Sequence, residues 1–360
     1  MTNESYDLFI QSGPVVTISA SDYFGLRHGL DTVFQLMAFD DVLQKFIILE
    51  EATILDSPAF QHRGVLLDSS RNFMPFETIR NVIDGMSYTK LNVLHWHITD
   101  TQSFPVALEN DPITSRMVEY GAYSPDKVYN KTEIADLVTY ATKKGVRIIP
   151  ELDAPAHVGS GWQGPDLEKY TVCVEKRPWD DFCVQPPCGQ LNPMVPGLDD
   201  VLKTIYAEFY EIFNFDSFHY GGDEVDFRCW GSEKSVTDPM LDEGLSLDET
   251  GFVTIWERFQ NKASEMIKEL TPNVEHILWT STLTHEEYID KLDDIYTIQI
   301  WTSSYVCYST QTSLSLIYLF TTCSRIHKSM QLLKVSTISC FPMLTLYTWT
   351  VDFPHMWAMV

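Results

Sequence analysis

The stretch Phe218-His219-Tyr220-Gly221-Gly222-Asp223-Glu224-Val225-Asp226 joins an apolar run, two glycines and two adjacent carboxylates. The apolar residues of 213–222 predict a buried strand, and glycines at its end let a ligand or another backbone come close. Adjacent residues of an extended chain point in different directions, so Asp223 and Glu224 would meet two different atoms of a bound molecule. In a parallel α/β barrel the carboxyl ends of the strands form the floor of the active site. A solvated acidic turn after a strand is the alternative interpretation.

Length and composition define the broad class of protein. The 360 residues can hold one large α/β barrel or two to three ordinary domains. With 44% hydrophobic residues the chain can bury a sizeable core. The net charge of -25 argues against nucleic acid and against an anionic membrane as a partner.

The seven cysteines are clustered, with Cys173, Cys183 and Cys188 inside 16 residues and Cys229 five residues after Glu224. No Cys-x-x-Cys pair or Cys/His ligand spacing predicts zinc, and disulfides formed in an oxidising compartment fit better. Residues 1–7 are polar and do not form a signal peptide. We therefore expect a secreted or lysosomal type of protein whose chain lacks its natural N-terminus.

From residue 62 onwards, strand-like and helical segments alternate. Strands are predicted at 62–69, 92–98, 146–152, 213–222, 275–279 and 296–301, with helices at 75–90, 131–144, 199–212 and 251–270 between them. This alternation is typical of a parallel α/β architecture. Residues 1–60 predict only a strand (15–20), a helix (22–37) and one or two short strands (46–55), so we interpret them as the remnant of a small α+β domain.

Polar residues collect where the predicted strands end, which favours a (β/α)8 TIM barrel over an open sheet. They are Asp68, Asp100, Glu151 with Asp153, Asp223 with Glu224, and Thr280 with Ser281. No Gly-x-Gly-x-x-Gly follows the first strand, so a dinucleotide cofactor is not expected. Eight strands close such a barrel and only six are clear, so the barrel is predicted to be incomplete.

His95 and His97 lie two residues apart on one predicted strand and could share a face as metal ligands. No third ligand lies within reach in the sequence, so we interpret them as structural histidines beside a polar core and expect no metal.

Five ordered motifs resemble the β-N-acetylhexosaminidases of glycoside hydrolase family 20, over roughly residues 15–303. They are His-Arg-Gly-Val-Leu-Leu-Asp-Ser-Ser-Arg (62–71), His-Trp-His-Ile-Thr-Asp (95–100) with Ser-Phe-Pro (103–105), Pro-Glu-Leu-Asp-Ala-Pro-Ala-His (150–157), Gly-Gln-Leu-Asn-Pro (189–193) and His-Tyr-Gly-Gly-Asp-Glu-Val (219–225). The segment from Cys173 to Cys188 and the strand end at Trp279 are most similar to insect and other animal members that cleave chitooligosaccharides. The resemblance implies an exo-acting, retaining enzyme that removes terminal GlcNAc or GalNAc.

The resemblance also implies roles for single residues. Glu224 would be the general acid and base, and Asp223 would orient the substrate's own 2-acetamido group, which replaces an enzyme nucleophile in this family. Arg63 would bind the 3- and 4-hydroxyls of the terminal sugar. Further expected roles are support of the acid by Asp100 and His157, and walls of the acetamide pocket formed by Trp279 and Trp301.

Other properties follow from the same resemblance. The expected disulfides are Cys183–Cys188 and Cys173–Cys229, and neither a metal nor a cofactor is implied. The expected partners are β-linked N-acetylhexosamine oligosaccharides or glycoconjugates. Many members dimerise, so a homodimer is also expected.

After residue 303 the chain departs from the family pattern. Residues 301–360 contain one acidic residue, Asp352, and no Gly, Glu or Asn, while Ser and Thr supply 18 of the 60. A shift of reading frame accounts for this: one DNA encoding of residues 346–353, read two bases later, gives Leu-Tyr-Leu-Asp-Cys-Gly-Phe, similar to the family's seventh-strand motif. Genuine divergence of the C-terminal region is the alternative.

The predicted organisation therefore has three parts: a remnant α+β domain (1–60), a catalytic barrel (61–303) and an aberrant barrel end (304–360). Because the last strands would carry active-site residues, an inactive or sugar-binding relative is the alternative to an active hexosaminidase.

Overall fold

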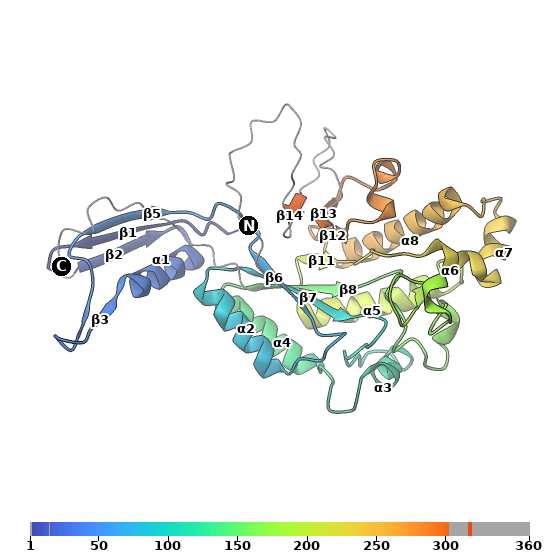
Figure 1. Cartoon of the computed structure of the whole chain (residues 1–360), viewed down its shortest axis with the longest axis horizontal. Helices are drawn as coiled ribbons and strands as arrows, with labels where there is room; N and C mark the ends of the chain where they lie inside the picture. Colours follow the sequence, from blue (N-terminus) through green and yellow to red (C-terminus); the bar gives the residue numbers. More distant parts are fainter. Residues whose placement is uncertain (1, 14, 302–315, 319–360) are drawn as a thin grey trace. The chain divides into compact units, whose positions relative to one another are not determined.

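The computed structural model describes residues 2–13, 15–301 and 316–318, and Figure 1 shows how its elements are arranged. The predicted frame shift and nearly all of the predicted aberrant segment (304–360) lie outside the described residues.

The N-terminal residues form a small antiparallel sheet with one helix. The sheet has the order β2-β1-β5, from β2 (Val15–Ala20), β1 (Tyr6–Gln11) and β5 (Ala52–Asp56). Helix α1 (Tyr23–Leu36) begins where the Asp22 side chain accepts hydrogen bonds from two backbone amides, and the hairpin β3 (Ala38–Asp40) and β4 (Lys45–Ile47) follows it. The sequence analysis missed β1, although its side chains alternate between buried and exposed. The prediction of a strand–helix–strand unit whose strands have no further partner was therefore wrong, because β1 is the middle strand and pairs with both β2 and β5.

The main sheet is parallel throughout and matches the predicted incomplete barrel. Its order is β6-β7-β8-β11-β12-β13-β14. The strands are β6 (Gly64–Asp68), β7 (Val93–Thr99), β8 (Arg147–Leu152), β11 (Ser217–His219), β12 (Glu275–Trp279), β13 (Tyr296–Ile300) and β14 (Leu316–Tyr318). The six predicted strands are confirmed, and β14 adds a short seventh. In the part of the chain that the structure describes, β6 and β14 do not pair, so the sheet is a curled half barrel.

Four long helices connect the strands and pack side by side in chain order: α2 (Phe76–Tyr88), α4 (Lys131–Lys143), α5 (Leu198–Phe213) and α8 (Glu249–Leu270). Shorter elements lie in the loops that leave the carboxyl ends of the strands. Besides single 3-10 turns they are α3 (Met117–Gly121), α6 (Phe227–Ser232), α7 (Lys234–Asp242) and the two-stranded pair β9 (Thr171–Val172) with β10 (Gln190–Leu191). The longest insertions therefore stand at the edge where a barrel holds its active site.

The two faces of the sheet differ in chemistry. On β7, Leu94, Trp96 and Ile98 belong to the main apolar core, and the Trp96 ring meets Phe76 of α2 and Phe213 of α5 edge to face. Alternation places Val93, His95 and His97 on the opposite face. There Val93 forms a small separate apolar cluster with Ile149 and Ile277, one layer of a barrel interior. Towards the carboxyl ends, polar side chains replace this apolar layer.

The strand that was predicted over 213–222 is much shorter. Helix α5 continues through Phe213, and Asn214 ends it in a left-handed conformation (φ 46°). Only Ser217–His219 is strand, because the two glycines then turn the chain away from the sheet.

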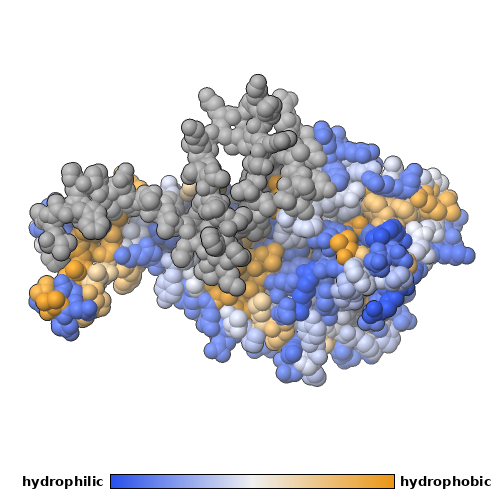
Figure 2. All heavy atoms as spheres, in the orientation of Figure 1, coloured by the Kyte–Doolittle hydropathy of each residue, from blue (hydrophilic) through white to orange (hydrophobic). Residues whose placement is uncertain are grey.

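Apolar side chains are also exposed. Figure 2 shows apolar surface over the β3–β4 hairpin, where Val42 is 91% and Phe46 71% exposed. No described helix is both long and apolar enough to cross a bilayer.

Candidate active site

The turn after β11 places Asp223 and Glu224 at the carboxyl edge of the sheet. Gly221 (φ 68°) and Gly222 (φ 81°) have left-handed backbones, and a Cβ on Gly221 would lie 1.8 Å from Asp153 Oδ1. The Gly222 amide donates to the same oxygen at 3.0 Å. Gly221 is therefore required by its backbone geometry and by the close approach of Asp153, and Gly222 by its left-handed backbone.

Glu224 faces His157 in a polar corner. Its Oε2 lies 3.3 Å from His157 Nε2, and His157 Nδ1 lies 3.3 Å from Asp100 Oδ1. Glu224 (φ 52°) and His157 (φ 56°) both have left-handed backbones. In non-glycine residues this strained conformation clusters at functional sites. The structure thus brings together the predicted acid and its predicted supporting pair.

Charge in this corner follows from burial and contacts. Burial alone lowers the pKa of His157, but the Asp100 and Asp153 carboxylates raise it well above its usual range. Burial alone raises the pKa of Asp100, but the His157 and His97 imidazoles lower it well below its usual range. A charged His157 beside an ionised Asp100 is the resulting state.

Asp223 points towards the same corner with an unused acceptor. One oxygen, Oδ2, lies 3.9 Å from His157 Nε2. The other, Oδ1, is buried and has no hydrogen-bond partner among the described residues. Burial and the neighbouring Glu151 and Glu224 carboxylates raise the pKa of Asp223, against the opposing effect of His157.

A pocket opens beside Glu224. It is lined by Glu224, His157, Thr101, Ala156, Gly189, Gln190 and part of the 183–188 loop. Glu224, whose side chain is 19% exposed, therefore lines a small pocket and is not enclosed in packed core.

Arg63 does not belong to this site, and its predicted role in binding the sugar is corrected here. It precedes β6 at the amino edge of the sheet, roughly 16 Å of strand from Asp68. Its guanidinium pairs with Glu4 and donates to the carbonyls of Phe60 and Lys90. Arg63 anchors the N-terminal residues to the sheet.

Arg71, in contrast to Arg63, lies at the carboxyl edge of the sheet beside the candidate site. It follows β6 at the carboxyl edge, with Nη1 2.6 Å from Asp68 Oδ2 and Nη2 2.8 Å from Asp100 Oδ2. Its side chain is 32% exposed. The signal was present in the sequence, because Arg71 stands three residues after Asp68, the end of the predicted strand, whereas Arg63 stands before that strand.

The two predicted tryptophans end neighbouring strands. Trp279 closes β12 and is 8% exposed, and its indole N–H donates to Glu151 Oε1 at 2.8 Å. Trp301 follows β13, is 43% exposed and donates to the Thr280 carbonyl at 2.8 Å. Both indoles therefore stand at the carboxyl edge, as expected.

Sequence reasoning missed the role of the buried polar layer below these residues. His95, His97, Glu151 and His219 project from adjacent strands into the half-barrel interior and are at most 5% exposed. His95 and His97 had been interpreted as structural, and Glu151 only as one polar strand end.

Ligand atoms of three groups lie close enough to share a cation: His95–Glu151–His219, His97–Asp100–Asp153 and Asp153–His157–Asp223. In the first group the polar atoms bond mainly within the protein, since His95 Nε2 bonds Glu151 and His219 Nδ1 accepts from the Gly221 amide. Similar internal bonds join His97 to Asp100, and we assign no metal to these residues.

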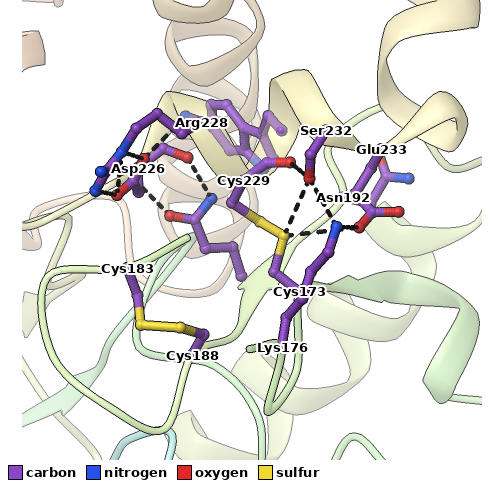
Figure 3. The surroundings of a disulfide bond; sticks show 12 residues. Cys173, Lys176, Cys183, Cys188, Asn192, Asp226, Arg228, Cys229, Ser232 and Glu233 are labelled. Atoms are coloured by element: carbon purple, nitrogen blue, oxygen red, sulfur yellow. Dashed lines mark hydrogen bonds and ion pairs between the residues drawn. A yellow bond between two sulfur atoms is a disulfide. The ribbon is translucent and has the colours of Figure 1, made fainter. Parts of the chain in front are cut away.

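Two disulfides brace the loops around the pocket (Figure 3). Cys173 bonds Cys229 and Cys183 bonds Cys188, the pairs that the family resemblance implied. Next to the first bridge, Lys176 Nζ pairs with Glu233 Oε1 at 2.6 Å. The first bridge ties the loop after β8 to α6, and the second closes the small ring that lines the pocket beside Glu224.

A parallel half barrel with adjacent carboxylates, an arginine and indoles at its carboxyl edge has the architecture of a (β/α)-barrel enzyme domain with its active site at that edge. Residues 60–318 match the model of the glycosyl hydrolase family 20 catalytic domain, and the chain belongs to that family.

Comparisons with individual proteins agree. The chain is 46% identical over 309 residues to a chitooligosaccharidolytic beta-N-acetylglucosaminidase of Bombyx mori, covering 84% of this chain and 51% of the relative. It is 37% identical over 248 residues to the human beta-hexosaminidase subunit beta, covering 69% of this chain and 42% of that relative. A Flavobacterium johnsoniae chitobiase structure superposes with a TM-score of 0.68 at 25% identity, covering 83% of this chain and 42% of that one. The chain spans about half the length of the curated insect relatives it matches.

Proposed function

We propose that this chain is an exo-acting, retaining β-N-acetylhexosaminidase that removes terminal GlcNAc or GalNAc from chitooligosaccharides or glycans. The observation that carries the proposal is the pair of carboxylates after β11. Glu224 lies against a charged His157 at the edge of a pocket, and Asp223 keeps a buried acceptor oxygen unused among the described residues. The names of the relatives support the substrate class.

The reaction follows from these two positions. Glu224 donates a proton to the glycosidic oxygen while the substrate's 2-acetamido oxygen attacks the anomeric carbon and expels the aglycone. Asp223 accepts a hydrogen bond from the acetamide N–H, and its negative charge stabilises the positive charge of the resulting oxazolinium ion. Glu224, now ionised, takes a proton from water, whose oxygen attacks the anomeric carbon and reopens the ring. Two inversions at that carbon give net retention.

The proposal extends to the surroundings of the two carboxylates. Arg71 binds the outer hydroxyls of the terminal sugar, since a planar donor fork suits vicinal hydroxyls. The indoles of Trp279 and Trp301 flank the acetamide. Homodimer formation and a secreted or lysosomal location belong to the same proposal, and the two disulfides support an oxidising compartment.

The direct test compares two substrates with the same chromogenic leaving group on the purified 360-residue chain. We expect hydrolysis of 4-nitrophenyl N-acetyl-β-glucosaminide and none of 4-nitrophenyl β-glucoside, because the glucoside has no 2-acetamido nucleophile. Binding of GlcNAc by the folded chain without hydrolysis would favour the sugar-binding alternative. Equal hydrolysis of both substrates would contradict the substrate-assisted mechanism.

The two arginines offer a matched prediction. Arg71→Gln removes charged donors from the carboxyl edge, and kcat/KM should fall roughly 100-fold, which corresponds to about 3 kcal/mol of charge-assisted hydrogen bonds. Arg63→Gln should lower Tm by several degrees, because it leaves the buried Glu4 unpaired. The kcat/KM of Arg63→Gln should stay within about two-fold of the original value, because substitutions away from a site usually change the free energy by only about 0.5 kcal/mol or less.

Steady-state kinetics and thermal unfolding of both variants check this assignment. Arg63→Gln with an unchanged Tm and a strongly reduced kcat/KM would restore the original assignment of Arg63 and refute that of Arg71.

A further inference from the structure

Glu151 stands at the centre of the buried polar layer. It lies near the end of β8 and is 0% exposed. Its Oε2 lies 2.6 Å from His95 Nε2 and 2.9 Å from His97 Nδ1, and its Oε1 accepts from the Trp279 indole at 2.8 Å. Burial alone raises the pKa of Glu151, but the His97 charge and the neighbouring imidazoles lower it well below its usual range. Glu151 is therefore a buried carboxylate with three donors around it.

Two sets of contacts, called branches below, start at Glu151. The first connects it through His97, Asp100 and His157 to Glu224, the proposed general acid. His97 has a carboxylate oxygen at each ring nitrogen, Glu151 at Nδ1 and Asp100 Oδ2 at Nε2 (3.0 Å). Because carboxylates only accept, both nitrogens carry protons and His97 is an imidazolium. The other oxygen of Asp100, Oδ1, contacts His157 Nδ1, and His157 Nε2 faces Glu224.

The second set of contacts of Glu151 leads to Trp279, the proposed wall of the acetamide pocket. Among the described residues the Trp279 indole N–H donates to Glu151 alone. Its ring lies 4.7 Å from the His219 ring and 5.4 Å from the His95 ring, centre to centre. The Gly221 amide donates to His219 Nδ1, so this imidazole is neutral, and burial lowers its pKa well below the usual range. Trp279 is thus fixed by the same group of side chains as the acid.

Only a carboxylate can serve both branches. In Glu151→Gln, an amide oxygen placed at Oε1 would accept from Trp279, and the NH₂ group would then face the two histidines. The opposite orientation would direct the NH₂ group at the Trp279 N–H. In either case one branch loses its acceptor.

We infer that Glu151 is a positioning residue that fixes the Trp279 wall of the acetamide pocket and, through His97, Asp100 and His157, the orientation of Glu224. The inference rests on the proposed hexosaminidase function for its consequences in catalysis. It assigns to one side chain, remote from the sugar, a simultaneous effect on substrate binding and on the chemical step.

The test compares Glu151→Gln with Glu208→Gln. Glu208 is also 0% exposed, but its carboxylate accepts from the backbone amides of Glu109 and Asn110 and not from the residues around Glu151. For Glu151→Gln we expect kcat/KM to fall roughly 10- to 100-fold, the range that loss of one buried acceptor produces, with changes in both KM and kcat. Glu208→Gln should lower Tm and leave KM and kcat of the folded fraction unchanged. Glu151→Gln behaving like Glu208→Gln would overturn the inference.

Two further variants separate the branches and serve if Glu151→Gln does not fold. Trp279→Phe removes the indole N–H and should mainly raise KM, whereas His97→Gln interrupts the link to Asp100 and should mainly lower kcat. The reverse pattern, or two identical patterns, would contradict the two-branch arrangement.

Two readouts do not need turnover and keep this inference separable from the proposed function. NMR of the ring nitrogens should show a doubly protonated His97 in the unmodified chain. The Trp279 fluorescence, isolated by subtracting the Trp279→Phe spectrum, should respond to Glu151→Gln. A chain that hydrolyses nothing would refute the proposed function alone, while a Glu151→Gln variant in which neither signal changes would refute the role of Glu151.

Discussion

Glu224→Gln should abolish most hydrolysis of a natural disaccharide by this chain, with kcat falling roughly 10³- to 10⁴-fold, near the upper end of what general acid catalysis contributes. The amide keeps the size of the carboxyl group and can still bond His157, but it cannot donate a proton to the glycosidic oxygen. Since the left-handed backbone at Glu224 (φ 52°) is set by the turn and not by the carboxyl, the variant should fold normally. Affinity for GlcNAc should change little.

The leaving group makes this prediction specific to proton donation. An aryl glycoside with a strongly acidic phenol needs little protonation, so its hydrolysis should fall far less, roughly 10- to 100-fold. Parallel measurements on chitobiose and on activated aryl glycosides check this difference. An equal loss on all substrates would mean that Glu224 has a role other than general acid.

Much of the fold was predictable because its pattern is local. Helix α4 was expected over 131–144 and spans Lys131–Lys143, and β12 agrees at both ends. Strand β11 was overestimated because the apolar face of α5 continues into Phe213 without a break in hydrophobicity, so composition alone could not separate helix from strand. Strand β1 was missed because residues 1–7 were judged only as a polar N-terminus, and the apolar Phe9 interrupts the alternation of Tyr6, Leu8 and Ile10.

The site was predicted where motifs are contiguous and missed where contacts cross the sheet. Asp223 and Glu224 follow each other in the sequence, and their partner His157 comes from another motif of the resemblance. Arg63 was misassigned because two arginines flank one strand, and only the direction of that strand decides which of them lies at the carboxyl edge. The role of Glu151 depends on the parallel register that sets His97 and His219 opposite it, which no single segment contains.

The interior of the half barrel links these observations. Most barrel interiors are filled by branched apolar side chains, and here Val93, Ile149 and Ile277 supply one such layer. Above it, alternation converts the interior into a layer of imidazoles around one carboxylate. Such a layer is stable only if each member is bonded, so substitutions within it should act together and not additively.

Asp223→Asn should reduce kcat roughly 100- to 1000-fold, the scale on which loss of one preorganised electrostatic contact acts. The buried Oδ1 lacks a partner among the described residues and would accept the acetamide N–H. An asparagine can offer an oxygen there but no negative charge, so the oxazolinium ion loses its counter-charge. The affinity of the variant for a neutral thiazoline analogue of that ion should also fall, but by a much smaller factor than kcat, because the analogue lacks the full positive charge of the ion.

The pH profile gives the second criterion for Asp223. Asp223 must be ionised to act, and burial raises its pKa, so activity of the unmodified chain should decline on acidification at a higher pH than for an ordinary aspartate. That acid limb should disappear from the residual activity of Asp223→Asn. Asp226→Asn is the matched control, since Asp226 caps α6 and pairs with Arg228, and asparagine still caps a helix. If Asp226→Asn reduced kcat as strongly as Asp223→Asn, the loop as a whole and not the Asp223 charge would be responsible.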